Sequence, residues 1–201
     1  MQVNICFCRQ FALILLEKKK ETMNVTVYLS SKTGVAQEYS QAVEEVARGI
    51  AEAGAQLVYG GSNAGQMHLL AAEAKRAGAR VVGIIPEVFR SLADPLADEM
   101  IYTRDLAARK NLLFAMADVI VALPGGIGTL DEVMSALAEM TVNRCYNKRI
   151  VLVNVGGLYD PLLCLLQRFA ELGLAAAEAV QTVVGVGSAR ECVDYLKTLK
   201  I

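Results

Sequence analysis

The sequence predicts a doubly wound α/β fold, in which helices cover both faces of a mostly parallel sheet. Three observations support this prediction. Runs rich in Val, Ile and Leu alternate with amphipathic segments along most of the chain, a pattern typical of parallel strands that are buried on both faces. Glycine-rich loops twice join a predicted strand to a predicted helix. No internal repeat or linker interrupts the alternation, so we expect one Rossmann-like domain over residues 23–201.

Short apolar runs predict the strands, at residues 25–29, 57–59, 81–85, 100–103, 119–123, 150–155 and 182–186. Apolar residues at helical spacing predict the helices, at residues 39–51, 67–77, 106–117, 129–140, 158–172 and 188–199. Gly54 and Gly78 can end the first two helices in left-handed caps. Ser188-x-x-Glu191 has the form of a capping box for the last helix, and residues 86–98 are predicted to be a loop or a short helix.

The composition is that of a globular protein, with 54% hydrophobic and 20% charged residues. Lys plus Arg (20) nearly balances Asp plus Glu (21), which argues against a general nucleic-acid binder. A bound phosphate would therefore be held by a few local cations and backbone amides. The five cysteines are odd in number and lack zinc-site spacing, so we expect reduced thiols, no metal and a cytoplasmic protein.

Residues 1–22 differ from the rest of the chain. Their apolar stretch, residues 11–16, precedes the charges of residues 17–21, whereas a secretory signal places its positive charge first. The stretch is also far shorter than the ~20 apolar residues of a membrane span. We therefore expect no membrane association. Our hypothesis is that residues 1–22 are an extension, arising from an upstream start codon, ahead of the strand that follows Met23.

The first glycine-rich loop, residues 59–65, follows a predicted strand and opens a predicted helix. Glycine lets a backbone approach a ligand closely, and a helix N-terminus favours negative charge. The loop matches neither the G-x-G-x-x-G fingerprint nor a P-loop, because it lacks the Lys-Ser/Thr pair of the latter. Gly60, Gly61 and Ser62 are therefore candidates for ligand binding, with a plain tight turn as the alternative.

The second loop, residues 123–132, has three glycines in four positions. Successive amides in such a loop can form a nest for an anion, and the dipole of the following helix adds to the attraction. The sequence therefore predicts an anion site whose members are Gly125, Gly126, Gly128 and Thr129.

Two carboxylates, Asp131 and Glu132, lie in the first turn of the helix after this loop. One interpretation is structural, because Thr129-x-x-Glu132 has the form of a capping box. The other is catalytic. If the apolar stripe at positions 130, 133, 134 and 137 is buried, Glu132 lies near the mouth of the loop. A carboxylate beside a bound phosphate would suit the stabilisation of a ribosyl cation.

Arg109 and Lys110 lie near the N-terminus of a predicted helix, where the helix dipole disfavours cations. Taken alone they indicate solvated surface charge. The single histidine, His68, is predicted to be a partly exposed surface residue.

Together, these motifs resemble one known family. Arg109-Lys110 followed by Pro124-Gly125-Gly126-x-Gly128-Thr129-x-x-Glu132 is similar to the LOG family of cytokinin riboside 5′-monophosphate phosphoribohydrolases, whose members were long called lysine decarboxylases. The likeness runs from about residue 23 to residue 199 and includes the loop that begins at Tyr59.

The resemblance implies a role for each matching residue. Gly125, Gly126, Gly128 and Thr129 would hold the 5′-phosphate, Glu132 and Arg109 would be the catalytic pair, and Lys110 would help to bind substrate. It also implies a Rossmann-like fold, a homodimer or higher homo-oligomer, and no cofactor.

The function implied is hydrolysis of a nucleoside 5′-monophosphate to free base and ribose 5-phosphate. The base is left open between a cytokinin and an adenine-like purine. The alternative is a carrier or binding protein that uses the same fold and phosphate nest without turnover, since some relatives of this fold carry a phosphate-bearing pterin cofactor.

Overall fold

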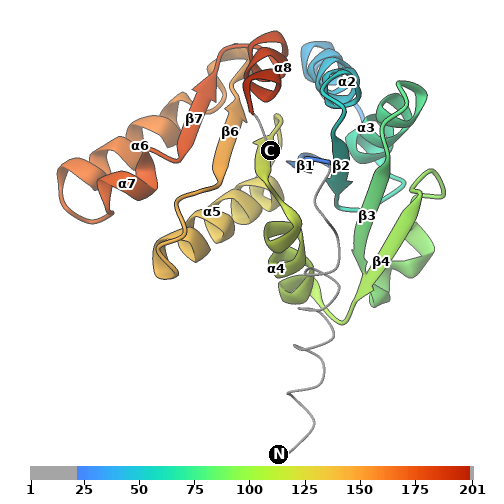
Figure 1. Ribbon diagram of the computed structural model, residues 1–201, viewed down its shortest axis with the longest axis horizontal. Helices are drawn as coiled ribbons and strands as arrows, with labels where there is room; N and C mark the ends of the chain where they lie inside the picture. The colour runs from blue at the N-terminus through green and yellow to red at the C-terminus, as the bar shows by residue number, and fades with distance from the viewer. Residues whose placement is uncertain (1–21, 200–201) are drawn as a thin grey trace, which may run out of the picture.

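The structure is a computed structural model, and it describes residues 22–199. The predicted extension therefore lies outside the described residues, apart from its last position. Seven parallel strands form one sheet in the order β4-β3-β2-β1-β5-β6-β7 (Figure 1). Their bounds are β1 Asn24–Tyr28, β2 Gln56–Tyr59, β3 Val81–Pro86, β4 Glu99–Thr103, β5 Val119–Ala122, β6 Arg149–Val153 and β7 Val183–Val186.

The order of the strands reverses beside β1. Val25 pairs in register with Leu57 of β2 on one side and with Val119 of β5 on the other. In open parallel sheets, ligands bind beyond the carboxyl ends of the strands at this reversal. We therefore expect a ligand site among the loops after β1, β2 and β5.

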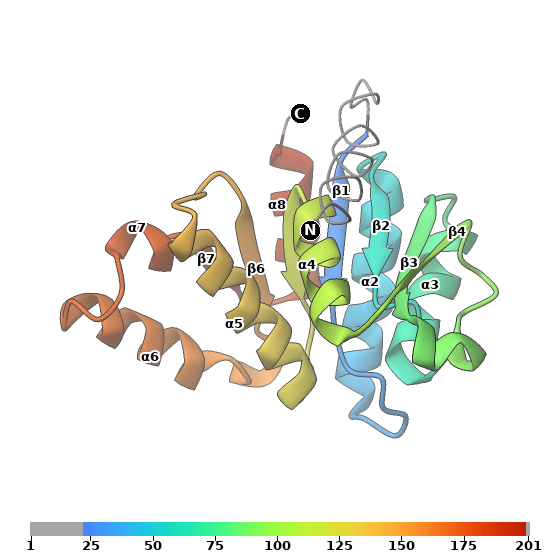
Figure 2. The same ribbon diagram turned by 90° about the horizontal axis from the view of Figure 1, so that it is seen from below.

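Helices cover both faces of the sheet, as predicted (Figure 2). One apolar core joins the sheet to α2, α3 and α8, and the other joins it to α4, α5 and α6. The helices are α2 Gln37–Glu52, α3 Gly65–Arg76, α4 Leu106–Met116, α5 Ile127–Val142, α6 Asp160–Glu171, α7 Ala177–Val180 and α8 Ala189–Thr198, with short 3-10 segments η1 Glu87–Leu92 and η2 Val155–Gly157. No helix within residues 22–199 is long and apolar enough to cross a membrane.

Most of the local predictions are confirmed. Gly54 and Gly78 adopt φ of +65° and +94° just beyond α2 and α3, as left-handed caps require. Ser188 Oγ accepts a hydrogen bond from the Glu191 amide at 3.2 Å, but the Glu191 carboxylate accepts from the amide of residue 187 rather than from that of Ser188. The short helix α7 was not predicted, because its four residues are too few to show helical periodicity.

Candidate active site

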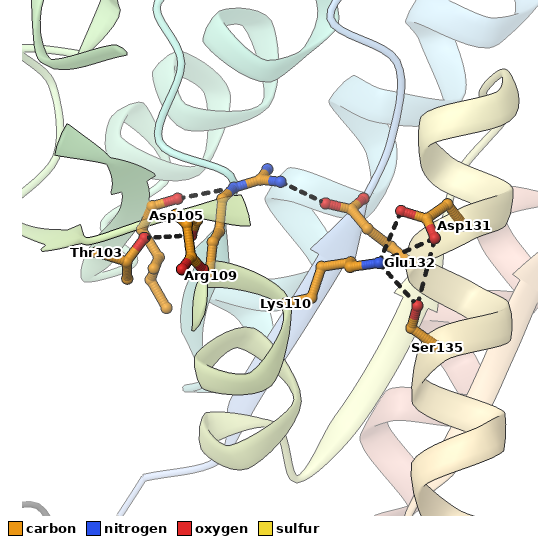
Figure 3. A network of polar contacts seen from close by, with 8 residues as sticks. Thr103, Asp105, Arg109, Lys110, Asp131, Glu132 and Ser135 are labelled. Atoms are coloured by element: carbon orange, nitrogen blue, oxygen red, sulfur yellow. Dashed lines mark hydrogen bonds and ion pairs between the residues drawn. The ribbon is translucent and has the colours of Figure 1, made fainter. Parts of the chain in front are cut away.

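The guanidinium of Arg109 lies at the carboxyl edge of the sheet. α4 begins next to β4, and its N-cap Asp105 accepts a hydrogen bond from the Ala108 amide at 2.7 Å. From the first turn of α4, Arg109 Nε donates to the Ile84 carbonyl at 3.1 Å, and Nη1 donates to Glu132 Oε1 at 2.8 Å (Figure 3). Arg109 thus joins the end of β3 to the first turns of α5.

The interpretation of Arg109 as solvated surface charge is wrong. Its side chain is only 11% exposed, and that of Glu132 only 7%. The helix dipole does disfavour a cation in this turn, but the Glu132 carboxylate and the Ile84 carbonyl supply the opposite charge and the acceptor. Removing one partner of a buried pair leaves the other charge unpaired, which typically costs about 3–5 kcal/mol.

The capping-box interpretation of Glu132 is also wrong. α5 begins at Ile127, two residues earlier than predicted, with Gly126 as N-cap, so Thr129 lies inside the helix. In the structure Leu130 lies at the surface, 41% exposed, and Glu132 is buried, so the apolar stripe predicted to be buried does not include position 130. Burial raises the pKa of Glu132, and the charge of Arg109 lowers it only in part. The carboxyl therefore ionises at a higher pH than an exposed glutamate does.

Lys110 and Asp131 form a second, more exposed ion pair beside Arg109 and Glu132. Lys110 Nζ lies 2.9 and 3.0 Å from the two carboxylate oxygens of Asp131 and donates to Ser135 Oγ at 3.1 Å (Figure 3). The Lys110 side chain is 26% exposed and that of Asp131 is 56% exposed. Asp131 therefore orients Lys110, and Ser135, which the sequence analysis did not single out, completes the contact.

The predicted anion loop lies between β5 and α5. A Cβ at Gly125 would collide with Thr129 Oγ1, whereas one at Gly126 or Gly128 would meet nothing within 4 Å. Open space therefore lies over the first turn of α5. The hydroxyl of Thr129 is buried and has no hydrogen-bond partner within residues 22–199. A buried polar atom without a partner is rare in folded proteins, and an acceptor bound at this loop would satisfy it.

The loop after β2 reaches the same site. A Cβ at Gly60 would collide with Arg109 Nη2, so only glycine lets the backbone pass this close to the guanidinium. Gly61 has φ of +71°, a conformation that glycine adopts without strain. Ser62 pairs with Ala93 in an isolated bridge, which fixes the middle of the loop. Gly60 thus lies beside Arg109, Gly61 packs against Ile84 of β3, and the position of Ser62 is set by the backbone.

Two tyrosines near the site were missed by sequence reasoning. Tyr159 donates its buried hydroxyl to the Leu123 carbonyl at 2.7 Å and so supports the start of the anion loop. Tyr28 ends β1, and burial followed by the charge of Glu132 raises its pKa far above the ordinary value. In the sequence both residues look like ordinary core aromatics.

No group of three or more metal-ligating side chains occurs in the described range 22–199. Two cationic side chains lie at the site, Arg109 and Lys110, and each is paired with a carboxylate of α5.

Comparison with known proteins identifies the family. The family described as "Possible lysine decarboxylase" matches residues 67–196. An Oryza sativa protein named "Cytokinin riboside 5'-monophosphate phosphoribohydrolase LOG" is 30% identical over 185 residues, which cover 90% of this chain and 75% of the relative. A Mycobacterium tuberculosis protein named "Cytokinin riboside 5'-monophosphate phosphoribohydrolase" is 34% identical over 169 residues, 83% of this chain and 89% of the relative.

The fold is also shared with solved structures of proteins that are not named as phosphoribohydrolases. The molybdenum cofactor binding protein of Rippkaea orientalis is similar with a TM-score of 0.69 and 25% identity, over 88% of this chain and 96% of that one. The fold, together with the similarity to these phosphoribohydrolases, defines a Rossmann-like enzyme of the hydrolase class that acts on N-glycosyl bonds. The chain belongs to the LOG family, as its motifs predicted.

Proposed function

We propose that this protein hydrolyses the N-glycosidic bond of a nucleoside 5′-monophosphate, giving free base and ribose 5-phosphate. The observation that carries the proposal is the buried Arg109–Glu132 pair, with its 2.8 Å contact, next to a loop whose Thr129 hydroxyl is buried without a partner in the described part of the chain. For the ribose 5-phosphate part of the substrate, this reaction requires an anion site that binds the phosphate and a carboxylate that acts at the ribose.

The 5′-phosphate would bind over Gly126 and Gly128, where the structure leaves space, and would accept a hydrogen bond from Thr129. The N-terminus of α5 adds a favourable dipole, and Lys110 supplies a partly exposed cation at the rim. Phosphate binding of this kind fixes the ribose relative to the reacting groups, and such positioning can lower a barrier by several kcal/mol.

Glu132 would take a proton from the attacking water or stabilise the ribosyl cation, as carboxylates do in glycoside hydrolysis. Its raised pKa suits a general base, which acts best when its pKa is near the working pH. Arg109 would hold the carboxylate in place and contribute positive charge where the negative charge of the phosphate or of the departing base develops.

For the substrate, we propose a purine nucleotide, either a cytokinin riboside 5′-monophosphate or AMP. The names of the relatives from Oryza sativa and Mycobacterium tuberculosis support the cytokinin form. The test is to incubate the protein with a panel of nucleoside monophosphates and the matching nucleosides and to measure released base by chromatography. Monophosphates should be cleaved and nucleosides should not. Equal turnover of AMP and adenosine would contradict the phosphate assignment.

The second candidate is a carrier that binds a phosphate-bearing cofactor without turnover. The similarity to the Rippkaea orientalis molybdenum cofactor binding protein supports it. A carrier has no need of a buried Arg109–Glu132 pair beside the anion loop, so this pair favours the enzyme. Tight binding of such a cofactor together with failure to release base from every monophosphate in the panel would establish the carrier instead.

We also propose that the protein forms a homodimer or a higher homo-oligomer. Support comes from three apolar side chains beside the site that are well exposed in the single chain, namely Leu106 (54%), Ile127 (89%) and Leu130 (41%). Light scattering on the purified protein would give the mass in solution, and a monomer at micromolar concentration would refute the proposal. A cytoplasmic location remains a prediction.

A further inference from the structure

A second group of titratable side chains lies near the loop after β2. His68, in the first turns of α3, places Nδ1 3.0 Å from Oδ2 of Asp94. The Asp94 side chain is completely buried, whereas that of His68 is 46% exposed. With Nδ1 occupied by the carboxylate, Nε2 is the ring nitrogen available to a ligand. A buried carboxylate that orients a half-exposed imidazole is an arrangement suited to proton transfer.

Asp94 is fixed by its surroundings. Its amide donates to the Gly61 carbonyl at 2.8 Å, and its Oδ1 accepts from the Leu96 amide at 3.0 Å. It also lies close to the buried Tyr59 phenol, whose pKa is raised by burial first and by the negative charge of Asp94 second. A buried carboxylate is destabilising unless it is paired. The ring of His68 contacts this carboxylate from the more exposed side.

The His68–Asp94 pair and the Arg109–Glu132 pair meet the same short loop. The Arg109 guanidinium packs against Gly60, and the Asp94 amide binds the carbonyl of the next residue, Gly61. Consecutive Cα atoms are about 3.8 Å apart. Asp94 is therefore anchored one residue away from the point where Arg109 touches the backbone.

The sheet sets the distance between the anion loop and the loop at Gly60, which the second pair adjoins. The anion loop follows β5, the loop at Gly60 follows β2, and β1 lies between these strands. Two strand spacings are about 10 Å, which is comparable with the length of a nucleoside monophosphate. A nucleotide with its phosphate over Gly126 and its C1′ at Glu132 can therefore extend its base across Gly60 towards His68.

We propose that His68 is the general acid that protonates the departing base, with Asp94 as its positioning residue. This inference rests on the proposed function. As the bond between C1′ and the base nitrogen breaks, its electron pair goes to the base, which takes the proton from Nε2 of His68. The water oxygen bonds to C1′ and its proton goes to Glu132. The base leaves neutral, and exchange with solvent restores both proton carriers.

His68→Gln tests this role, because glutamine can still bond to Asp94 but carries no transferable proton. The variant is compared with the wild type on AMP, or on whichever monophosphate is cleaved best, and on 4-nitrophenyl riboside 5′-phosphate, whose leaving group departs without protonation. We expect kcat to fall about 100-fold or more on the nucleotide, with KM changed less than about threefold. On the nitrophenyl compound we expect kcat within about threefold of the wild type.

A second readout uses the nucleotide alone. A general acid gives an alkaline limb in the pH profile of kcat, and we expect this limb to be absent in His68→Gln. In Asp94→Asn, assayed on both substrates, we expect kcat to fall on the nucleotide more than on the nitrophenyl compound, because the imidazole loses the carboxylate that orients it. Melting curves show whether each variant folds. Arg76→Ala, at the other end of α3 and highly exposed, is the matched control and should behave as the wild type.

The outcomes separate the two proposals. Equal losses on both substrates with the alkaline limb retained would assign His68 a structural role and overturn the inference, as would unchanged turnover of the nucleotide in His68→Gln. If the wild type cleaves no monophosphate at all, the proposed function fails, and the inference fails with it.

Discussion

Arg109 and Glu132 approach each other to 2.8 Å across the carboxyl edge of the sheet, although they lie 23 positions apart in the chain. One comes from the first turn of α4 and the other from the second turn of α5, and both are almost completely buried. Burial raises the pKa of the carboxyl while the guanidinium opposes that shift. The pair is thus a carboxylate held in place at the site where we propose that the ribose binds.

Glu132→Gln is expected to reduce turnover of the nucleotide by roughly two orders of magnitude or more, comparable to the loss of one strong electrostatic contact in a closed site. Glutamine can still accept a hydrogen bond from Arg109, so the variant should fold. Binding of ribose 5-phosphate should persist or tighten, because a negative neighbour has been removed. Steady-state kinetics and calorimetric titration measure the two effects.

Glu139→Gln provides the control for that experiment. Glu139 lies two turns further along α5, exposed and bonded to Asn143, so its substitution should leave turnover unchanged. Near-normal turnover in a well-folded Glu132→Gln protein would remove Glu132 from the mechanism.

The pH profile should reveal the raised pKa of Glu132. A group that must be ionised loses activity as the pH falls through its pKa, so the acid limb of kcat should lie above the ordinary range of a glutamate. Arg109→Gln removes a charge that lowers this pKa, and the limb of the residual activity should therefore move to higher pH. The second ionisation of the substrate phosphate, near pH ~6, would not move. A limb at the same pH in both proteins would assign it to the substrate.

Thr129→Val replaces a buried hydroxyl that has no partner in the described range with a methyl group of similar shape. Because no protein hydrogen bond is lost, the stability of the free protein should be unchanged or slightly higher. A hydrogen bond to a charged group contributes about 1.5–3 kcal/mol, so binding of the nucleotide should weaken about 10- to 100-fold. Equilibrium binding of ribose 5-phosphate checks this.

Thr26→Val is the matched substitution. The buried Thr26 hydroxyl donates to the Leu113 carbonyl at 3.2 Å, away from the anion loop. This variant should lose about 1 kcal/mol of stability and keep its affinity. If the Thr129→Val and Thr26→Val variants bind ribose 5-phosphate equally well, the Thr129 hydroxyl does not contact the phosphate.

Tyr159→Phe should weaken the support of the anion loop. It removes the hydroxyl that donates to the Leu123 carbonyl at 2.7 Å and leaves this buried acceptor without that donor, at an expected cost of about 1–3 kcal/mol. We expect a lower Tm and a higher KM, with kcat at saturation less affected. Tyr195→Phe, on α8 across the sheet, should leave KM unchanged. An unaltered KM in Tyr159→Phe would show that the Tyr159 hydroxyl does not support substrate binding.

Much of the fold follows from local features of the sequence. The continuous Val, Ile and Leu runs can only be buried on both faces, which requires a parallel sheet between two layers of helices. The glycines after α2 and α3 terminate these helices because their positive φ costs glycine little. The three glycines after β5 likewise indicate an anion loop, which stays a prediction.

Other features depend on residues distant in sequence, which only the tertiary structure brings together. The sequence alone determined the sheet, the helices and the candidate residues of the site. The start of α5 at Ile127, which excludes the capping interpretation of Glu132, was not predictable, and neither was the direct contact of Glu132 with Arg109. The His68–Asp94 contact joins residues 26 positions apart. Charge pairing of this kind depends on where the fold brings two elements together at the edge of the sheet. The spacing of residues along the sequence therefore does not predict it.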